Sequence, residues 1–252
     1  MAKLTERHSE IKRLIKERSP FSEDESNQIL NEWFNSIPTL VKIVVEKYQF
    51  DKKKVLDIGC TYGNSLLYWK ENSEGIEMQD HMVKFLRALG RTVHKINVED
   101  GFSDLKEEGY DAIYAAALLE HLVAPHLFLL RLNPLLKPDG LLAISYPLVP
   151  PSIFQNFWQV VVGYKGWTDS THVNFFTARD SKLMIERAGF KVIKQHVPAF
   201  YRIPLFKKID NVFLPIGMSC LSICQKITNF KYPKKRFYQF DPSWAPDLKK
   251  FH

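Results

Sequence analysis

Cysteine is scarce in this 252-residue chain, which contains only Cys60, Cys220 and Cys224. Three cysteines cannot all pair, so no disulfide framework follows and we expect a reducing compartment. No long hydrophobic run is present either: the most apolar segment, Val212–Cys224, is interrupted by a proline and a glycine and falls short of the roughly 20 residues that span a bilayer. The charged N-terminus lacks the apolar core of an export signal. These absences predict a cytoplasmic protein.

Positive charge is concentrated toward the end of the chain. The formal net charge is +7, yet residues 203–252 hold nine Lys and Arg against three Asp and Glu, which leaves the first 202 residues close to neutral. Residues 229–252 form a basic, aromatic tail that suits an anionic surface, or docks on its own domain as an ordinary solvated segment. The positive net charge therefore indicates what the tail contacts and says little about the function of the rest of the molecule.

Periodicity divides the remainder into a helical extension, 1–49, and an alternating β/α domain, 50–228. Ser22 and Glu25 have the spacing of a capping box, and Thr39–Tyr48 is predicted to be a further helix. The alternation predicts a doubly wound, mostly parallel, seven-stranded Rossmann-like sheet with an insertion after the fifth strand. The predicted strands are Lys54–Ile58, Glu74–Glu77, Thr92–Asn97, Tyr110–Ala115, Gly140–Tyr146, Phe190–His196 and Met218–Lys226. The predicted helices between them are Ser65–Glu71, Gln79–Leu89, Ala124–Leu136 and Thr177–Ala188.

The first strand leads into a glycine turn, in the run VLDIGCTYG that starts at Val55. Its spacing is not the GxGxxG of a dinucleotide site. Gly59 suits a turn that a ligand approaches closely. Asp57 would repel a pyrophosphate at the start of the following helix, so a cationic ligand fits better.

Polar residues follow the next two predicted strands. Glu77 can accept both hydrogens of a ribose diol, and the segment from Asn97 to Glu99 offers polar groups where an adenine edge would lie. The site therefore suits a nucleoside with positive charge and no phosphate, and S-adenosyl-L-methionine matches that description.

These blocks, in order, resemble the class I S-adenosylmethionine-dependent methyltransferases of the small-molecule type. The blocks are VLDIGCTYG, GIE, NVED, YDAIYAAALLEHL and LLKPDGLLAISYP, with a weaker echo in THVNFFT. The resemblance implies a Rossmann-like fold, the cofactor S-adenosyl-L-methionine, the product S-adenosyl-L-homocysteine, and methylation as the activity. The cofactor-binding residues that it implies are Asp57, Gly59, Cys60, Gly63, Glu77, Met78, Asn97, Val98, Glu99 and Ala115. The chain departs from the family pattern at three positions. Thr61 and Asp139 stand where glycine is usual, and Asn97 stands where an acidic residue is usual.

Two histidines are candidates for a general base. His121 follows the fourth strand, where the cofactor methyl would point, and His172 lies in the THVNFFT block. Each also suits a purely structural role in a loop. No His, Cys or Asp cluster has metal-ligand spacing along the sequence, so we expect no metal.

The sequence thus predicts methylation of a small-molecule or glycan-like acceptor by direct methyl displacement, at oxygen in preference to nitrogen. Residues 148–176 are expected to form a lid or substrate insertion, with Trp33, Phe34, Trp158 and Trp167 as apolar walls. Nucleic acid is not the expected acceptor. Three alternatives stay open: an RNA methyltransferase, a non-catalytic cofactor-binding or scaffold protein, and a nicotinamide-dependent reductase. The acceptor and the oligomeric state are not fixed by the sequence.

Overall fold

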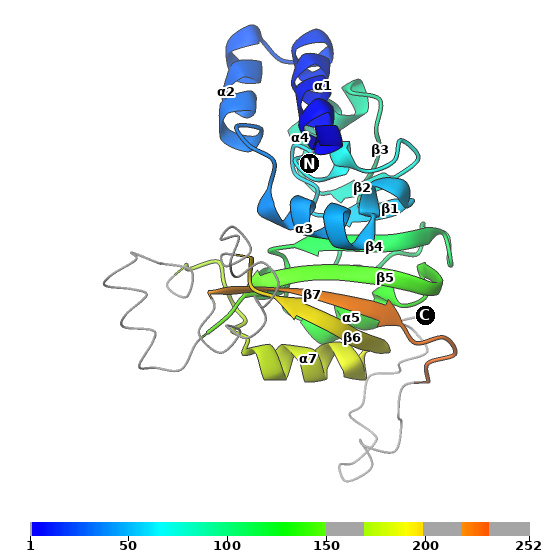
Figure 1. Ribbon diagram of the computed structural model, residues 1–252. Coiled ribbons are helices and arrows are strands. Elements are labelled where there is room, and N and C mark those ends of the chain that lie inside the picture. The colour runs from blue at the N-terminus through cyan, green and yellow to red at the C-terminus, as the bar shows by residue number, and fades with distance from the viewer. Residues whose placement is uncertain (1, 150–168, 199–217, 232–252) are drawn as a thin grey trace.

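The computed structural model describes residues 2–149, 169–198 and 218–231. Its seven strands form one sheet in the order β3-β2-β1-β4-β5-β7-β6 (Figure 1). The predicted seven-stranded Rossmann-like sheet is confirmed. The strands are β1 Val55–Ile58, β2 Glu74–Glu77, β3 Thr92–Lys95, β4 Tyr110–Ala116, β5 Leu136–Pro147, β6 Phe190–His196 and β7 Ser219–Lys226.

The first five strands are parallel, and β7 inserts antiparallel between β5 and β6. Asp57 lies opposite Tyr114, and Ile58 opposite Ala115. The carboxyl ends of β1, β2, β3, β4 and β5 therefore share one edge of the sheet, which is where ligands of such sheets bind.

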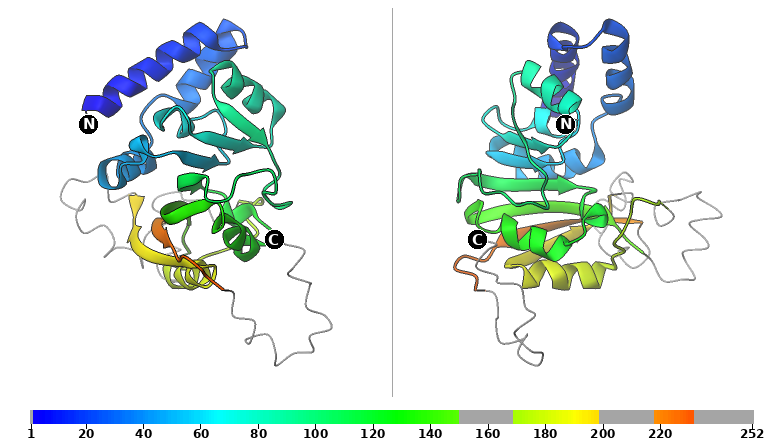
Figure 2. Two further views of the ribbon diagram at one scale, coloured as in Figure 1. Left: turned by 90° about the vertical axis from the view of Figure 1, so that its right-hand side faces the viewer. Right: turned by 180° about the vertical axis from the view of Figure 1, so that it is seen from behind.

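Alternate residues of each strand point to opposite faces of the sheet, so both faces present side chains that need to be buried. Helices cover both faces. Val55 belongs to a core with the first four helices, and Leu56 to a core with the last two. The pair α1 and α2 lies at one end of the molecule and α7 at the other (Figure 2). The α-helices are α1 Ala2–Arg18, α2 Glu23–Trp33, α3 Thr39–Tyr48, α4 Asp80–Ala88, α5 Pro125–Leu132 and α7 Ala178–Arg187.

The predicted capping box is formed in the structure. Ser22 Oγ accepts from the Glu25 amide at 3.3 Å, and the Glu25 carboxylate accepts from the Ser22 amide at 3.0 Å, which closes the capping box of α2. Thr177 Oγ1 accepts from the Asp180 amide at 3.1 Å at the start of α7. None of the helices in the described ranges is long and apolar enough to cross a membrane.

The predicted helix Ser65–Glu71 is wrong: the chain forms only a 3₁₀ turn, η2, over Leu66–Tyr68. Leu66, Leu67, Tyr68 and Trp69 are all buried, and a regular helix would turn some of them to solvent. The guanidinium of Arg91 donates to the carbonyls of residues 67, 69, 70 and 71 over 3.2–3.5 Å. It thereby satisfies groups that helical hydrogen bonds would otherwise occupy.

The first helix is fastened to this turn. Arg7 Nε donates to the Leu67 carbonyl at 3.1 Å, and His8 Nδ1 lies 2.5 Å from the Tyr68 hydroxyl. Buried side chains from both N-terminal helices, among them Ile15, join the core of the sheet. The extension and the sheet therefore share one hydrophobic core.

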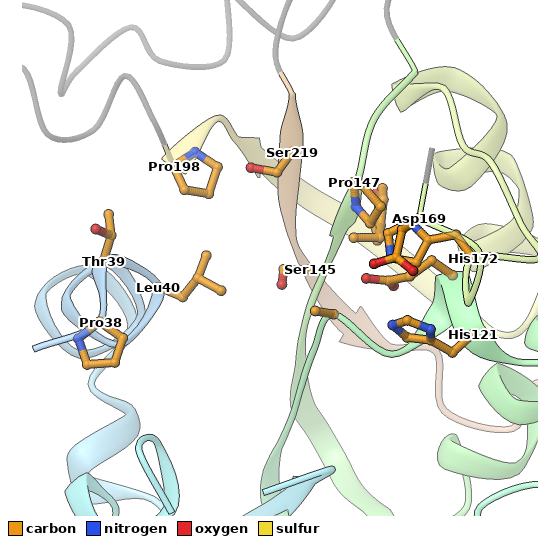
Figure 3. A pocket seen from close by; sticks show the side chains of 13 residues that line it. Pro38, Thr39, Leu40, His121, Ser145, Pro147, Asp169, His172, Pro198 and Ser219 are labelled. Atoms are coloured by element: carbon orange, nitrogen blue, oxygen red, sulfur yellow. The ribbon is translucent and has the colours of Figure 1, made fainter. Parts of the chain in front are cut away.

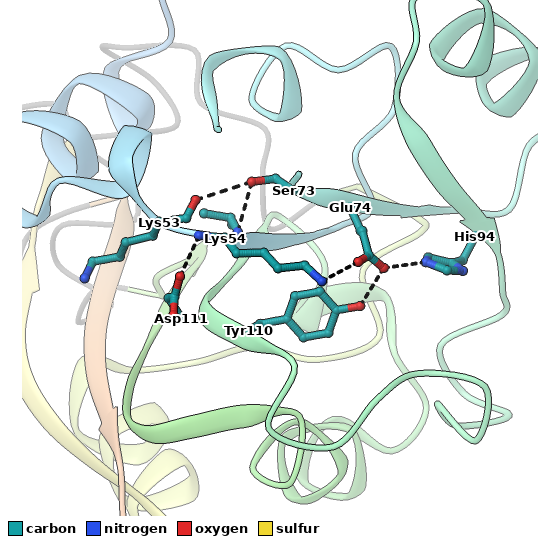
Figure 4. A network of polar contacts seen from close by, with 8 residues as sticks. Lys53, Lys54, Ser73, Glu74, His94, Tyr110 and Asp111 are labelled. Atoms are coloured by element: carbon teal, nitrogen blue, oxygen red, sulfur yellow. Dashed lines mark hydrogen bonds and ion pairs between the residues drawn. The ribbon is translucent and has the colours of Figure 1, made fainter. Parts of the chain in front are cut away.

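A polar network joins four strands at the amino edge of the sheet, opposite the ligand-binding edge (Figure 4). Glu74 accepts from Lys54 Nζ at 2.6 Å, from the Tyr110 hydroxyl at 2.8 Å, and lies 2.7 Å from His94 Nε2. Burial opposes ionisation of Glu74, but these three partners outweigh it and lower the pKa of its carboxyl. The network ties β1, β2, β3 and β4 together away from the site.

Several expectations lie outside the described residues. They are Trp158 and Trp167 with most of the predicted lid, and residues 232–252 of the basic tail. Of the other proposed walls, Phe34 is fully buried in the core, so it is not available to a ligand. Trp33 packs against Tyr62, with 5.6 Å between ring centroids.

Candidate functional site

The glycine turn after β1 is open toward the carboxyl edge. Gly59 has φ +71°, and a Cβ added there would meet only Leu118 Cδ1, at 3.9 Å. Gly63 has φ +82°, but a Cβ there would lie 2.5 Å from a Leu86 methyl group. Gly59 therefore leaves room for a ligand, whereas Gly63 lets the turn pack on α4.

Asp57 is enclosed beneath this turn. Its Oδ2 accepts from the Trp69 indole at 2.8 Å, and the side chain is 1% exposed. Burial raises the pKa of Asp57 to about 7, although hydrogen bonds from Ser65 and Trp69 work in the opposite direction. Its charge near neutral pH is therefore sensitive to the surroundings.

Cys60 contributes packing rather than a reactive group. Its amide donates to the Ile76 carbonyl at 3.1 Å, and its sulfur occupies the space beside Gly75. Burial raises the pKa of the Cys60 thiol, so the neutral form is favoured. The residue holds the turn against β2.

Glu77 joins the glycine turn to the start of α4. Its Oε2 accepts from the Thr61 amide at 2.9 Å, and its Oε1 accepts from the amides of Met78 and Gln79 at 2.8 and 3.0 Å. A carboxylate has about four lone-pair sites, so Oε2 retains one that a ribose hydroxyl can use. Thr61 reaches this contact with φ +48°, the left-handed conformation that glycine normally supplies.

The remaining cofactor candidates lie along the same edge. Met78 is 55% exposed after β2, and Ala115 is buried near the end of β4. After β3, the Asn97 side chain accepts from the Glu99 amide at 3.2 Å, and Val98 packs on the core. Glu99 Oε1 accepts from the Val123 amide, which ties this loop to the one before α5. The predicted cofactor residues thus lie along one edge of the sheet, where Asp57, Cys60, Glu77 and Ala115 are buried and Met78 is exposed.

A pocket of about 500 Å³ opens beside this edge, at the ends of β4 and β5 (Figure 3). One wall is apolar and comes from the start of α3, including Pro38 and Leu40. The opposite wall carries His121, His172 and Asp169, with Ser145 between them. The structure therefore assembles one pocket from segments that are far apart in the sequence.

The two predicted histidines lie together in that wall. Their ring centroids are 4.8 Å apart, and His121 Nδ1 lies 3.1 Å from the Thr171 carbonyl oxygen. Glu120, on the 3₁₀ turn η3 Leu119–His121, is the buried carboxylate beside them. Burial raises the pKa of Glu120, and its own amide and the two histidines act in the opposite direction. Glu120 was not among the predicted site residues, and its only signal in the sequence is its position next to His121.

Comparison with known proteins identifies the family of the chain. The family model described as "Methyltransferase domain" matches residues 7–195. The (S)-coclaurine N-methyltransferase of Papaver somniferum is 26% identical over 117 residues, which span 42% of this chain and 33% of that enzyme. The match thus reaches only a third of the poppy enzyme's length.

Two of the solved structures that share the fold serve as examples. The first is an S-adenosylmethionine-dependent methyltransferase from Thermotoga maritima, with TM-score 0.56 and 16% identity, covering 81% of this chain and 95% of that one. The second, in complex with the Trm112 methyltransferase activator of Haloferax volcanii, has TM-score 0.56 and 14% identity, covering 81% and 94%. With the sheet order, the open glycine turn and the family match, the chain belongs to the class I S-adenosylmethionine-dependent methyltransferases.

The residues present fit the family's cofactor. The turn at Gly59 leaves space for the amino-acid end, and Glu77 keeps an acceptor site for the ribose. Met78 offers an exposed apolar surface where the adenine would lie. The bound cofactor would supply a methyl group on a positively charged sulfur, ready for transfer to a nucleophile.

Proposed function

We propose that this protein transfers the methyl group of S-adenosylmethionine to a hydroxyl oxygen of a small-molecule or glycan-like acceptor. The observation that carries this proposal is the pocket at the ends of β4 and β5, next to the cofactor edge, with His121 and His172 in its wall. Its apolar wall suits the body of an acceptor, and its polar wall suits the reacting hydroxyl.

The protein's part in such a transfer is mainly alignment and exclusion of water, because the methyl group is already activated. His121 or His172 would take the hydroxyl proton as the oxygen attacks. The helical extension 1–49 and the insertion 148–176 would form the acceptor side of the domain 50–228. Pro38 and Leu40 already contribute from the extension, and Asp169 and His172 from the insertion.

Calorimetry with S-adenosylhomocysteine tests the cofactor site. We expect one-to-one binding, at least about tenfold weaker in Glu77→Gln, because the neutral amide is a poorer acceptor for a ribose hydroxyl. Glu71→Gln, at an exposed position before β2, serves as the control and should bind like the wild type. Absence of binding to the wild type, or equal binding by Glu77→Gln, would contradict the assignment.

A screen with isotopically labelled cofactor against a fractionated extract of the native cell tests the transfer. If His121 or His172 is the base, the alanine variant of that histidine should lose turnover at least about 100-fold. Its affinity for S-adenosylhomocysteine should stay nearly intact. Unchanged turnover in both variants would remove the proposed base.

An amine acceptor is the second candidate, and the similarity to an N-methyltransferase from poppy favours it. The same screen separates the two, because an O-methyl and an N-methyl product differ in the carbon shift of the labelled methyl group. Labelled nucleic acid as the sole product would instead support an RNA methyltransferase.

A further inference from the structure

We propose that Glu120, His121 and His172 bind a divalent first-row transition-metal ion in the wall of the acceptor pocket. One ligand atom from each of the three lies within 4.8 Å of the others. Ligands around such an ion, at about 2.0–2.2 Å from it, lie roughly 3 Å apart, so modest side-chain rotations would complete the set. Two histidines and one carboxylate on one side of an ion leave its other positions open, as in the facial arrangement of two His and one carboxylate.

Two buried polar atoms in the wall favour the binding of a cation there. Within the described residues, Glu120 Oε2 and His172 Nδ1 are buried without a hydrogen-bond partner. The Glu120 residue is 2% exposed, and a lone carboxylate there is costly unless a positive charge compensates it. A bound divalent ion would supply that charge and partner both atoms.

The second nitrogen of each histidine already faces an oxygen. The Thr171 carbonyl only accepts, so His121 Nδ1 must carry the proton, and in the neutral ring Nε2 keeps its lone pair. His172 Nε2 lies 3.9 Å from Asp169 Oδ2, which is ion-pair distance and too far for a direct hydrogen bond, and the buried Nδ1 is left as its ligand atom. Metal-binding histidines generally direct their other N–H at a carbonyl or carboxylate in this way.

The two loops that carry the ligands are fastened to each other. The Glu120 carbonyl accepts from the amides of Val173 and Asn174 at 2.8 and 3.1 Å. Asn174 Nδ2 also donates to the carbonyls of Leu119 and Leu122. His172 is therefore held beside Glu120 by bonds that do not involve the ligand atoms. Its distance along the sequence from the Glu120-His121 pair explains why local spacing gave no sign of a metal site.

The ion's role in catalysis rests on the proposed function. An acceptor hydroxyl bound to an open position would become more acidic and lose its proton to water. The oxygen lone pair then forms the O–CH₃ bond, while the S–CH₃ bond breaks and its electron pair stays on sulfur. The products are the methyl ether, neutral S-adenosylhomocysteine and one released proton. The methyl transfer is common to this arrangement and to the proposed function, but here both imidazoles act as ligands, so activation by the ion is the alternative to a histidine base.

Metal titration of the full-length protein, stripped with a chelator, tests the site directly. Co²⁺ is the optical probe and Zn²⁺ the calorimetric one. We expect one ion per chain, with binding more than about 100-fold weaker in Glu120→Gln and His172→Gln, and about tenfold weaker in Asp169→Asn. His81→Gln, an exposed histidine on α4, is the matched control and should bind like the wild type. Near-UV circular dichroism checks that each variant is folded.

The absence of one-to-one binding by the wild type, or equal binding by folded Glu120→Gln, would overturn the site. S-adenosylhomocysteine affinity is measured on the same samples, and we expect it to be the same in Glu120→Gln as in the wild type. Metal binding without S-adenosylhomocysteine binding would support the site and refute the proposed function. Methyl transfer that withstands the chelator at full rate would overturn the ion's catalytic role and leave the histidine base.

Discussion

Asp57 is an ionisable group placed where water does not reach it. Only hydrogen bonds from the Trp69 indole and Ser65 offset that burial, and the pKa of the carboxyl rises to about 7. A cationic ligand at the turn above would favour the charged form. Asp57 favours a cationic ligand through its charge, and a bound cation in turn favours the charged form of Asp57.

Asp57→Asn should change how stability depends on pH. Burial raises the pKa of Asp57 to about 7 in the folded chain, from an ordinary value of 3.8 that applies to the unfolded chain. Between these values the unfolded chain has released the proton and the folded chain has kept it, so stability falls as pH rises. The variant should lack this fall and, at pH 8, be more stable than the wild type by on the order of a few kcal/mol.

Melting temperatures across this pH range, without cofactor, check the prediction. The exposed Asp104→Asn is the control and should retain the wild-type slope. A slope unchanged in Asp57→Asn would show that other groups cause it.

Thr61 and Asp139 show which part of the family pattern is preserved. Both stand where glycine is usual, and both keep positive φ, +48° and +61°. The backbone conformation has therefore survived the loss of the residue type that most easily adopts it. The sequence shows that glycine is replaced at these two positions. The positive φ is retained through contacts such as the hydrogen bond from the Thr61 amide to Glu77, and a local sequence pattern does not predict such contacts.

At the level of elements, the sequence predicted regular segments well and the irregular one badly. The bounds of α3 and β6 are as predicted, because an apolar period and clear end signals coincide there. The segment after the glycine turn has apolar residues in succession and forms η2 instead of a helix. Its carbonyls depend on Arg91, which comes from beyond the next strand and helix, so no local signal could have shown this.

Arg91→Lys should destabilise the protein by about 2–4 kcal/mol, because an ammonium cannot reproduce the fork of donors that four carbonyls use, two of them in buried contacts. Urea denaturation measures the loss as a lower midpoint. Arg13→Lys is the control, since Arg13 is 74% exposed in a surface pair and should stay within about 0.5 kcal/mol of the wild type. A small effect of Arg91→Lys would mean that water molecules can donate hydrogen bonds to these carbonyls in place of Arg91.

On the scale of the whole molecule, the acceptor pocket was the least predictable feature. The sequence placed His121 and His172 as separate candidates, and the fold brings them into contact. It adds Glu120 from the turn and an apolar wall from the start of α3. The pocket forms only when segments that are distant in the sequence pack together. The cofactor edge is built from the ends of consecutive strands, and short sequence motifs identify those strand ends.

The shared core predicts that the extension and the sheet unfold together. Ile15 on α1 is fully buried, so Ile15→Ala should cost about 2–5 kcal/mol. Tryptophan fluorescence and far-UV circular dichroism should report one coincident transition at a lower urea concentration. Ile193→Ala, at a position 49% exposed, should have little effect. Two separate transitions would show that the helices form an independent unit.

The sheet also has an order of assembly during synthesis. β6 pairs with β7 alone among the described strands, and β7 is the strand that separates it from β5. Until Lys226 has left the ribosome, β5 presents an open edge and β6 has no neighbour. A nascent chain at that stage carries unpaired strand edges, so we expect aggregation to be most favoured in the interval before β7 inserts.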